Sequence, residues 1–346
     1  MRRSSLVAAA LVSIAVTSVD AAPRWALVVH GGAGVIDRKT LTSEQDAAYR
    51  VALARATETG AVVLRGGGSA LDAIEATIVV MEDDPLFNAG RGAVFAASGR
   101  NELDAALMDG RSLEAGAVAG VTLTRHPISL ARRVMQKSPH VLLIGPGADA
   151  FSLEQGLEQV EPSWFYTERR WRELEKSLSE KALPIPPRPP RIPAEPPGNG
   201  LTQVEGKQGT VGVVALDQHG NLAAGTSTGG TTAKRWGRVG DSPIIGAGTY
   251  ASNTSCAVSA TGSGEYFIRL TVAREICALV EYKGMGLQSA ADVVVRNRLT
   301  ALGGAGGVIA LTPDGQLAWS FNTSGMYRAR LADGQPLTVG IYQDDP

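Results

Sequence analysis

A dense run of prolines divides this sequence and limits what the chain can form around it. Eight of the 18 prolines lie between Pro184 and Pro197. Proline fixes φ and has no N–H to donate, so this stretch can be neither a helix interior nor a central strand. We therefore expect a linker that runs to about Gln208 and is mobile at its end. An ordered pattern resumes abruptly at Thr210, which places a linker directly before a core strand.

The segment after the linker is typical of a β-hairpin. Residues 210–217 and 221–228 are two strand-like runs, and residues 218–220 are turn residues with a late glycine. Stepping outward from this turn along both strands brings Thr210 opposite Thr228. The hairpin therefore predicts two hydroxyl groups within cross-strand reach at its open end.

Hydrophobic periodicity predicts further elements on both sides of the linker. A Ser or Thr near residue 42, and Ser69 followed three residues later by Asp72, indicate helix starts. We expect strands at 25–30 and 141–144, short apolar segments over 93–123, a hairpin over 307–320, helices at 42–64, 69–82, 264–282 and 287–302, and a charged amphipathic segment at 164–178. Strands, then helices, then strands favour layered sheets with helices outside.

The charge balance and the cysteine count exclude several classes of protein. The 33 Lys and Arg against 34 Asp and Glu give a net charge of -1, which argues against a basic nucleic-acid-binding domain. Two cysteines, Cys256 and Cys277, cannot form a disulfide scaffold or a Cys-rich zinc site, and the sequence leaves their pairing open.

The first 21 residues have the pattern of a secretory signal peptide. Arg2 and Arg3 precede a short apolar run, and small residues lead to a cleavage position after Ala21. We therefore expect a periplasmic or secreted protein that has no membrane segment after signal removal. The apolar run is too short for a permanent transmembrane helix.

Cleavage before Thr210 would give the chain a nucleophile with its own base. A free α-amine has an ordinary pKa of about 7.7–8.0 and can take the proton from the Thr210 hydroxyl. On the linker alone, an ordinary strand threonine after a loop remains the simpler interpretation.

Eight short motifs change that balance. Together, and in this order, they resemble the plant-type asparaginase and isoaspartyl peptidase family of N-terminal nucleophile hydrolases. The motifs are His-Gly-Gly-Ala-Gly at 30–34, Phe-Asn-Ala-Gly-Arg-Gly at 87–92, Glu-Leu-Asp-Ala at 102–105, Gly-Thr-Val-Gly-Val-Val at 209–214, Gly-Thr-Ser-Thr-Gly-Gly at 225–230, Gly-Arg-Val-Gly-Asp-Ser-Pro at 237–243, Thr-Gly-Ser-Gly-Glu at 261–265 and Phe-Asn-Thr at 321–323.

The resemblance implies an α+β fold, a four-layer αββα sandwich. It also implies autocatalytic cleavage into an alpha subunit, residues 22–209, and a beta subunit, residues 210–346, which together form one domain. The end of the alpha subunit, 164–209, would be the charged and then proline-rich linker. Two such heterodimers would associate.

The same resemblance assigns catalytic roles. Thr210 is implied as the nucleophile, and the Gly209–Thr210 bond as the cleavage site. Thr228 is implied to hydrogen-bond near it, as the hairpin register also predicts. The Thr261 hydroxyl and the Gly262 N–H resemble an oxyanion hole, where donors meet developing negative charge.

Substrate recognition is implied at a second group of residues. Arg238 can bind a carboxylate with two hydrogen bonds, and Asp241 can accept from an ammonium group. Gly264 and Ser263 would close the pocket, and Asn88 would lie near it. These charges match a β-linked aspartyl unit with free α-carboxylate and α-amine.

The resemblance implies no cofactor for catalysis, but it implies a structural sodium ion held by backbone carbonyls. The positions are Met81, Glu82, Asp84, Phe87, Ala89 and Arg91. Carbonyl oxygens suit such a hard cation.

The implied reaction is hydrolysis of β-aspartyl dipeptides and L-asparagine to release L-aspartate. A glycosylasparaginase-like amidase is an alternative, against which Gly229 argues. An unprocessed secreted binding protein on the same scaffold is another. A Ser-based α/β-hydrolase fails because all four histidines precede Ser227. Gln208 before the cleavage site departs from many relatives and leaves the efficiency of processing open.

Overall fold

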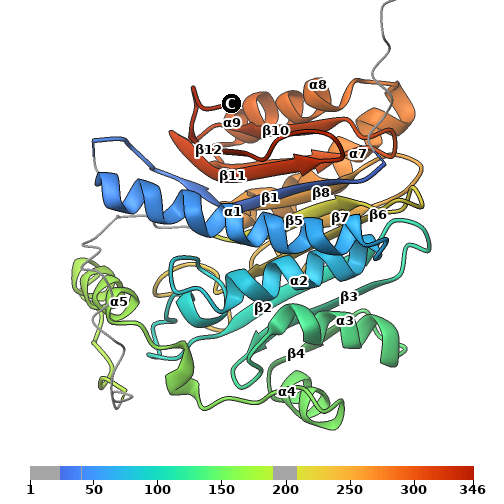
Figure 1. The fold of residues 1–346 in the computed structure, drawn as a ribbon. Helices are drawn as coiled ribbons and strands as arrows, with labels where there is room; N and C mark the ends of the chain where they lie inside the picture. Colours follow the sequence, from blue (N-terminus) through green and yellow to red (C-terminus); the bar gives the residue numbers. More distant parts are fainter. Residues whose placement is uncertain (1–23, 40, 190–208) are drawn as a thin grey trace, which may run out of the picture.

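Two β-sheets pack face to face between two layers of helices in this computed structural model, which describes residues 24–39, 41–189 and 209–346. Helices α1, α2 and α3 cover the outer face of the larger sheet, and α7 and α8 cover the smaller one (Figure 1). This is the predicted α+β arrangement of four layers. The predicted signal peptide and residues 190–208 of the predicted linker lie outside the described residues.

The larger sheet has eight strands, antiparallel except for the β3–β4 pair. Its central strand β5 is buried along its whole length, which fits its run of valines. In spatial order the strands are β12 (Thr338–Tyr342), β11 (Gly325–Ala332), β1 (Ala26–Gly34), β5 (Val211–Leu216), β6 (Leu222–Thr228), β2 (Leu103–Asp109), β3 (Ala115–Val121) and β4 (Leu142–Ile144).

The smaller sheet has four antiparallel strands and lies against β1, β5 and β6. In spatial order these are β10 (Leu317–Phe321), β9 (Gly306–Leu311), β8 (Ala257–Gly262) and β7 (Thr249–Ala251). The helices are α1 (Ser43–Arg65), α2 (Ala70–Glu82), α3 (Pro127–Lys137), α4 (Gly145–Glu154), α5 (Glu168–Glu180), α6 (Gly264–Leu270), α7 (Val272–Lys283), α8 (Leu287–Asp292) and α9 (Thr300–Leu302), with short 3₁₀ turns η1 (Gly90–Gly92) and η2 (Pro162–Phe165) and a π-helical stretch η3 (Val293–Leu299).

The predicted hairpin and the predicted cap at Ser69 are confirmed, and the Ser or Thr expected near the start of the first helix is Thr42. Strands β5 and β6 pair antiparallel with Val211 opposite Ser227, which continues to Thr210 opposite Thr228. Thr42 begins α1 with a capping box, and Ser69 begins α2 with another. The amphipathic segment forms α5, and its Trp171 is fully buried.

Two predicted elements differ from the structure. Strand β1 does not end at His30 but continues to Gly34, with an irregularity between His30 and Gly32. The predicted helix 264–282 is broken at Thr271, which adopts the left-handed conformation with φ 46°. The break lets the first amides of α7 bind the 246–247 loop, since Ala273 N donates to Ala247 O at 3.1 Å.

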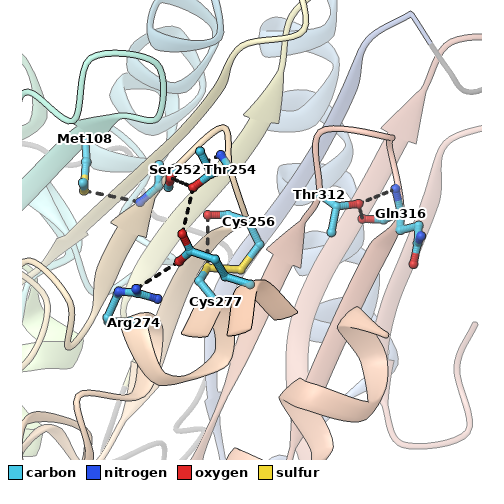
Figure 2. The surroundings of a disulfide bond; sticks show 10 residues. Met108, Ser252, Thr254, Cys256, Arg274, Cys277, Thr312 and Gln316 are labelled. Carbon is cyan, nitrogen blue, oxygen red and sulfur yellow. Dashed lines mark hydrogen bonds and ion pairs between the residues drawn. A yellow bond between two sulfur atoms is a disulfide. The ribbon is translucent and has the colours of Figure 1, made fainter. Parts of the chain in front are cut away.

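A disulfide joins Cys256, just before β8, to Cys277 in α7 (Figure 2). It links the smaller sheet to the helix that covers it. Thr254 and Arg274 lie beside the disulfide, and both bind Glu281. Among the helices of the described residues, none combines the length and the apolar character needed to cross a bilayer.

Candidate active site

Two threonine hydroxyls meet at the open end of the β5–β6 hairpin. Thr210 Oγ1 donates to Thr228 Oγ1 at 3.1 Å, and both residues are buried. Thr228 Oγ1 also accepts from Gly230 N at 3.0 Å and points its own proton toward Gly209 O at 3.4 Å. Thr228 therefore touches both the proposed nucleophile and the carbonyl of the bond whose cleavage would expose it.

Glycines allow other backbone segments to lie against the Gly209–Thr210 peptide. Gly32 has φ +114°, a conformation that favours glycine. A Cβ added to Gly32 would lie 2.8 Å from Gly209 Cα and 3.3 Å from Thr210 N. A Cβ on Gly209 would lie 3.3 Å from Asn88 Cβ. A side chain at Gly32 would therefore displace the peptide that is predicted to be cut.

Asn88 binds the loop before β2 to the turn after β6. Its Nδ2 donates to Gly230 O at 2.8 Å, and its Oδ1 accepts from Val94 N at 2.9 Å. A Cβ added to Gly229 would lie 2.7 Å from both Ala93 Cβ and Asn88 Oδ1. Any larger residue at Gly229, including asparagine, would therefore disturb this contact.

Thr261 and Gly262 end strand β8 beside the same glycine loop. Thr261 is buried, and its Oγ1 accepts from Ala33 N at 3.3 Å, one residue from Gly32. A Cβ on Gly262 would lie 2.4 Å from Ala305 O, so β8 and β9 approach closely here. Ser263 follows as the N-cap of α6 but makes no side-chain capping hydrogen bond.

Arg238 and Asp241 meet at Gly264. A Cβ on Gly264 would lie 2.8 Å from both Arg238 Nη2 and Asp241 Oδ1. Gly230 links them to the hydroxyl pair, because its own Cβ would lie 3.5 Å from Arg238 Nη1 while its N–H binds Thr228. The structure thus brings the two predicted substrate-binding side chains together and places Arg238 beside the turn that binds Thr228.

Arg238 and Asp241 differ in their surroundings. Arg238 donates through Nε and Nη2 to Glu265 at 2.9 and 3.1 Å, which leaves Nη1 facing Gly230. Asp241 is 5% exposed, and its Oδ2 has no hydrogen-bond partner within the described part of the chain. Burial raises the pKa of Asp241 to about 7. A cationic group that binds here could therefore donate a hydrogen bond to the buried Oδ2 of Asp241.

The predicted cation loop follows α2 and folds back on it. Cβ atoms added to Gly90 and Gly92 would lie 2.3 Å from Glu82 O and 2.0 Å from Phe87 O, so both carbonyls face this glycine turn. The Met81, Asp84 and Ala89 carbonyls each accept a backbone N–H nearby, and Arg91 lies over the Trp164 ring. Within the described ranges, no cluster of three His, Cys, Asp or Glu side chains could hold a metal ion.

Glu82 also has a buried side chain that the sequence did not single out. Its Oε1 accepts from Ser227 Oγ at 2.6 Å and from Ile128 N at 3.1 Å. Burial raises the pKa of Glu82 to about 8, so the carboxyl is largely protonated at neutral pH.

Sequence reasoning missed three side chains near the site. His30 Nδ1 lies 2.9 Å from Thr210 O, Glu265 holds Arg238, and buried Lys234 lies 3.9 Å from Asp104. His30 and Glu265 lie inside the motifs that carry the family resemblance. Their contacts cross between distant segments, so spacing along the chain gave no signal for them.

Known proteins are similar to this chain over nearly its whole described length. The family model described as asparaginase matches residues 23–341. The isoaspartyl peptidase of Salmonella typhimurium (strain LT2) is 48% identical over 320 residues, 92% of this chain and 98% of that protein. The isoaspartyl peptidase of Escherichia coli (strain K12) is 48% identical over 318 residues, 92% and 96% of the two chains. The isoaspartyl peptidase/L-asparaginase of Homo sapiens is 40% identical over 322 residues, again 92% and 96%.

Proposed function

This chain belongs to the asparaginase family and hydrolyses β-aspartyl dipeptides and L-asparagine, and we propose that Thr210 carries the reaction as an N-terminal nucleophile. The observation that supports this most is the Thr210–Thr228 hydroxyl pair, which directly follows the predicted linker and is connected through Gly230 to Arg238.

The chain first acts on itself. Thr210 Oγ attacks the Gly209 carbonyl carbon, the Gly209–Thr210 C–N bond breaks, and the nitrogen takes up a proton to become the α-amine. Water then opens the resulting ester and leaves a carboxylate on Gly209. Thr228 supports this step, because its hydroxyl contacts both Thr210 Oγ1 and Gly209 O.

Substrate hydrolysis repeats the same chemistry with a new acyl group. The α-amine of Thr210 takes the proton from its own Oγ, which attacks the substrate's side-chain carbonyl. The Thr261 hydroxyl and the Gly262 N–H donate to the oxygen that becomes negative. The departing amine takes the proton, and water releases L-aspartate from the ester.

Arg238 and Asp241 select the aspartyl end of the substrate. The α-carboxylate binds Arg238 at Nη1, since Nε and Nη2 already hold Glu265. The α-ammonium binds the free Oδ2 of Asp241. Both contacts fix which carbonyl meets Thr210. Gly264 permits this because any side chain there would enter the space between the two charged groups.

Two substitutions at Thr210 test the proposal. Thr210→Ala removes the nucleophile, so the chain should stay uncut and release no aspartate from either substrate type. Thr210→Ser keeps a hydroxyl and an α-amine, so it should retain part of both activities. Intact mass and an aspartate-release assay measure these outcomes. A cut or active Thr210→Ala chain would contradict the assignment.

We also propose that the loop after α2 holds a sodium ion through backbone carbonyls. The Glu82 and Phe87 carbonyls, which face the Gly90–Gly92 turn, suit a hard cation. Bound sodium would stabilise this loop, and it takes no part in the chemical steps. The melting temperature should rise in sodium relative to an equal concentration of tetramethylammonium, and equal values would contradict the proposal.

We further propose export to the periplasm or outside the cell, and assembly of two alpha–beta heterodimers. The sequence pattern of residues 1–21 and the Cys256–Cys277 disulfide support export, because such bonds persist in oxidising compartments. Cell fractionation tests the location, and light scattering of the purified protein tests the assembly. A cytosolic protein or a single heterodimer would contradict the respective proposal.

A further inference from the structure

A line of polar side chains crosses the apolar space between the two sheets. His30 of β1, Thr226 of β6, Ser259 of β8 and Thr249 of β7 are all 0% exposed. Around them the facing sheets bury an apolar cluster that includes Val28, Val214 and Ile309. Burying polar groups there is costly unless each one is hydrogen-bonded, so each of the four should have a partner.

The strand register brings these four residues together. His30 pairs with Gly212 of β5, and Gly212 pairs with Thr226, so the three occupy one row of the larger sheet. Thr249 pairs with Ser259 in the smaller sheet. A Cβ on Gly212 would lie 2.0 Å from Ser259 Oγ and 2.3 Å from His30 Nε2. The missing side chain of Gly212 therefore leaves the space in which His30 and Ser259 meet.

The hydrogen bonds run in one direction and end at the proposed nucleophile. Thr210 O can only accept, so His30 Nδ1–H donates to it at 2.9 Å. Burial lowers the pKa of His30 to about 3, so Nε2 carries no proton and accepts from Ser259 Oγ at 3.0 Å. Ser259 in turn accepts from Thr226 at 2.7 Å.

Thr249 completes the line at its far end. Its Oγ1 lies 2.7 Å from Thr226 Oγ1 and 3.0 Å from Ser242 O, between which its single proton is shared. The Thr226 hydroxyl has one proton and two acceptors in reach, Ser259 Oγ at 2.7 Å and Gly248 O at 3.3 Å. Because the contact with Ser259 is the shorter one, we assign the proton to it, and Thr249 then donates to Thr226.

We propose that Thr226, Ser259 and His30 are positioning residues that orient Thr210 by holding its main-chain carbonyl. This carbonyl sits on the same Cα as the nucleophilic side chain and the future α-amine. Fixing the carbonyl limits rotation of the Thr210 backbone and keeps Oγ1 on Thr228. The inference deepens the proposed function and rests on Thr210 as the nucleophile. It assigns a role to three groups that touch no substrate.

Thr226→Val tests the proposal, because valine has nearly the same shape as threonine. Valine keeps the volume and removes the donor to Ser259, so the line is broken two residues from Thr210. Thr226→Ser keeps the hydroxyl and serves as the conservative rescue. Thr57→Val is the matched control, because Thr57 is equally buried but donates only to Leu53 O within α1. Ser259→Ala, measured in parallel, breaks the line next to His30 with a smaller change of volume.

The N-terminus of each variant is determined first, and kcat and KM are then measured with a β-aspartyl dipeptide for every variant that begins at Thr210. Misplacing a reacting group is costly in rate, so Thr226→Val and Ser259→Ala should lower kcat about tenfold or more with KM within about threefold. Thr226→Ser should recover most of kcat, and Thr57→Val should retain it. A Thr226→Val chain that stays uncut yet melts as the Thr210→Ala precursor does also supports the proposal, because the same orientation governs the first attack.

Three results would overturn the proposal. The first is that Ser259→Ala, together with Thr226→Val if it is processed, has the same kcat as the Thr57→Val control. Another is a loss confined to KM, and the third is a Thr226→Ser variant as slow as Thr226→Val. If Thr226→Val fails to fold, Ser259→Ala decides alone. Because every assayed variant begins at Thr210, such results would leave the proposed nucleophile in place, whereas an active Thr210→Ala chain would remove both proposals.

Discussion

The charge on Asp241 should govern how tightly the enzyme binds the ammonium group of its ligands. Burial raises the pKa of this carboxyl from its ordinary value to about 7, and its Oδ2 is free to accept. A carboxyl with a raised pKa loses its charge as the pH falls. Affinity for an α-ammonium should therefore weaken on the acid side of neutrality.

The size of the effect follows from the ionised fraction of Asp241. With a pKa of about 7, the carboxylate form falls from roughly ten elevenths at pH 8 to roughly one eleventh at pH 6, about a tenfold change. The inhibition constant of a ligand that requires the carboxylate should rise by about the same factor.

Competitive inhibition by L-aspartate and by L-malate separates this effect from the chemistry. Both ligands carry two carboxylates, but malate has a hydroxyl in place of the ammonium. Between pH 8 and pH 6 the L-aspartate constant should rise about tenfold, while the malate constant should stay level or fall. Asp241→Asn should weaken L-aspartate binding at pH 8 and remove its pH dependence. Parallel curves for both ligands, or an unchanged L-aspartate curve in Asp241→Asn, would refute the reasoning.

Three further changes probe other parts of the molecule. Thr228→Val should lower kcat about a hundredfold, the low end of the range for a residue that takes part in proton transfer. Thr228→Ser should lose less, and a Thr228→Val variant with kcat within about tenfold of wild type would contradict this. Burial raises the pKa of Glu82 to about 8, so between pH 5 and 8 the native state keeps a proton that the unfolded chain has released. The free energy of unfolding should therefore fall over this range by up to about 1.4 kcal/mol per pH unit. Urea unfolding of the uncut Thr210→Ala chain should show a shallower fall with Glu82→Gln, and equal slopes would count against the assignment. Replacing Cys256 and Cys277 by alanine removes a disulfide between residues 21 positions apart. The loss should cost about 3 kcal/mol of stability with little change in kcat, and an unchanged melting temperature would be inconsistent with this.

The parts that could be predicted from the sequence are those set by local rules. The β5–β6 register follows from a short turn, and counting outward from that turn is enough to place Thr210 opposite Thr228. The capped starts of α1 and α2 follow from side chains three residues apart. Family motifs supplied Arg238 and Asp241, which the structure brings together at Gly264.

The parts that could not be predicted depend on contacts between distant segments. Thr271 breaks a helix that periodicity makes continuous, because the amides of α7 bind a loop more than 20 residues earlier. The bond between His30 and Ser259 joins two sheets and requires a glycine at a third position, Gly212. Burial of Asp241 and Glu82, which sets their pKa values, also emerges only when the layers are stacked.

The N-terminal sequence of the active polypeptides tests the central claim most directly. Purified protein that releases aspartate should contain a polypeptide of 137 residues that begins Thr-Val-Gly-Val, with an intact mass that matches residues 210–346. Active protein in which no polypeptide begins at Thr210 would contradict the account.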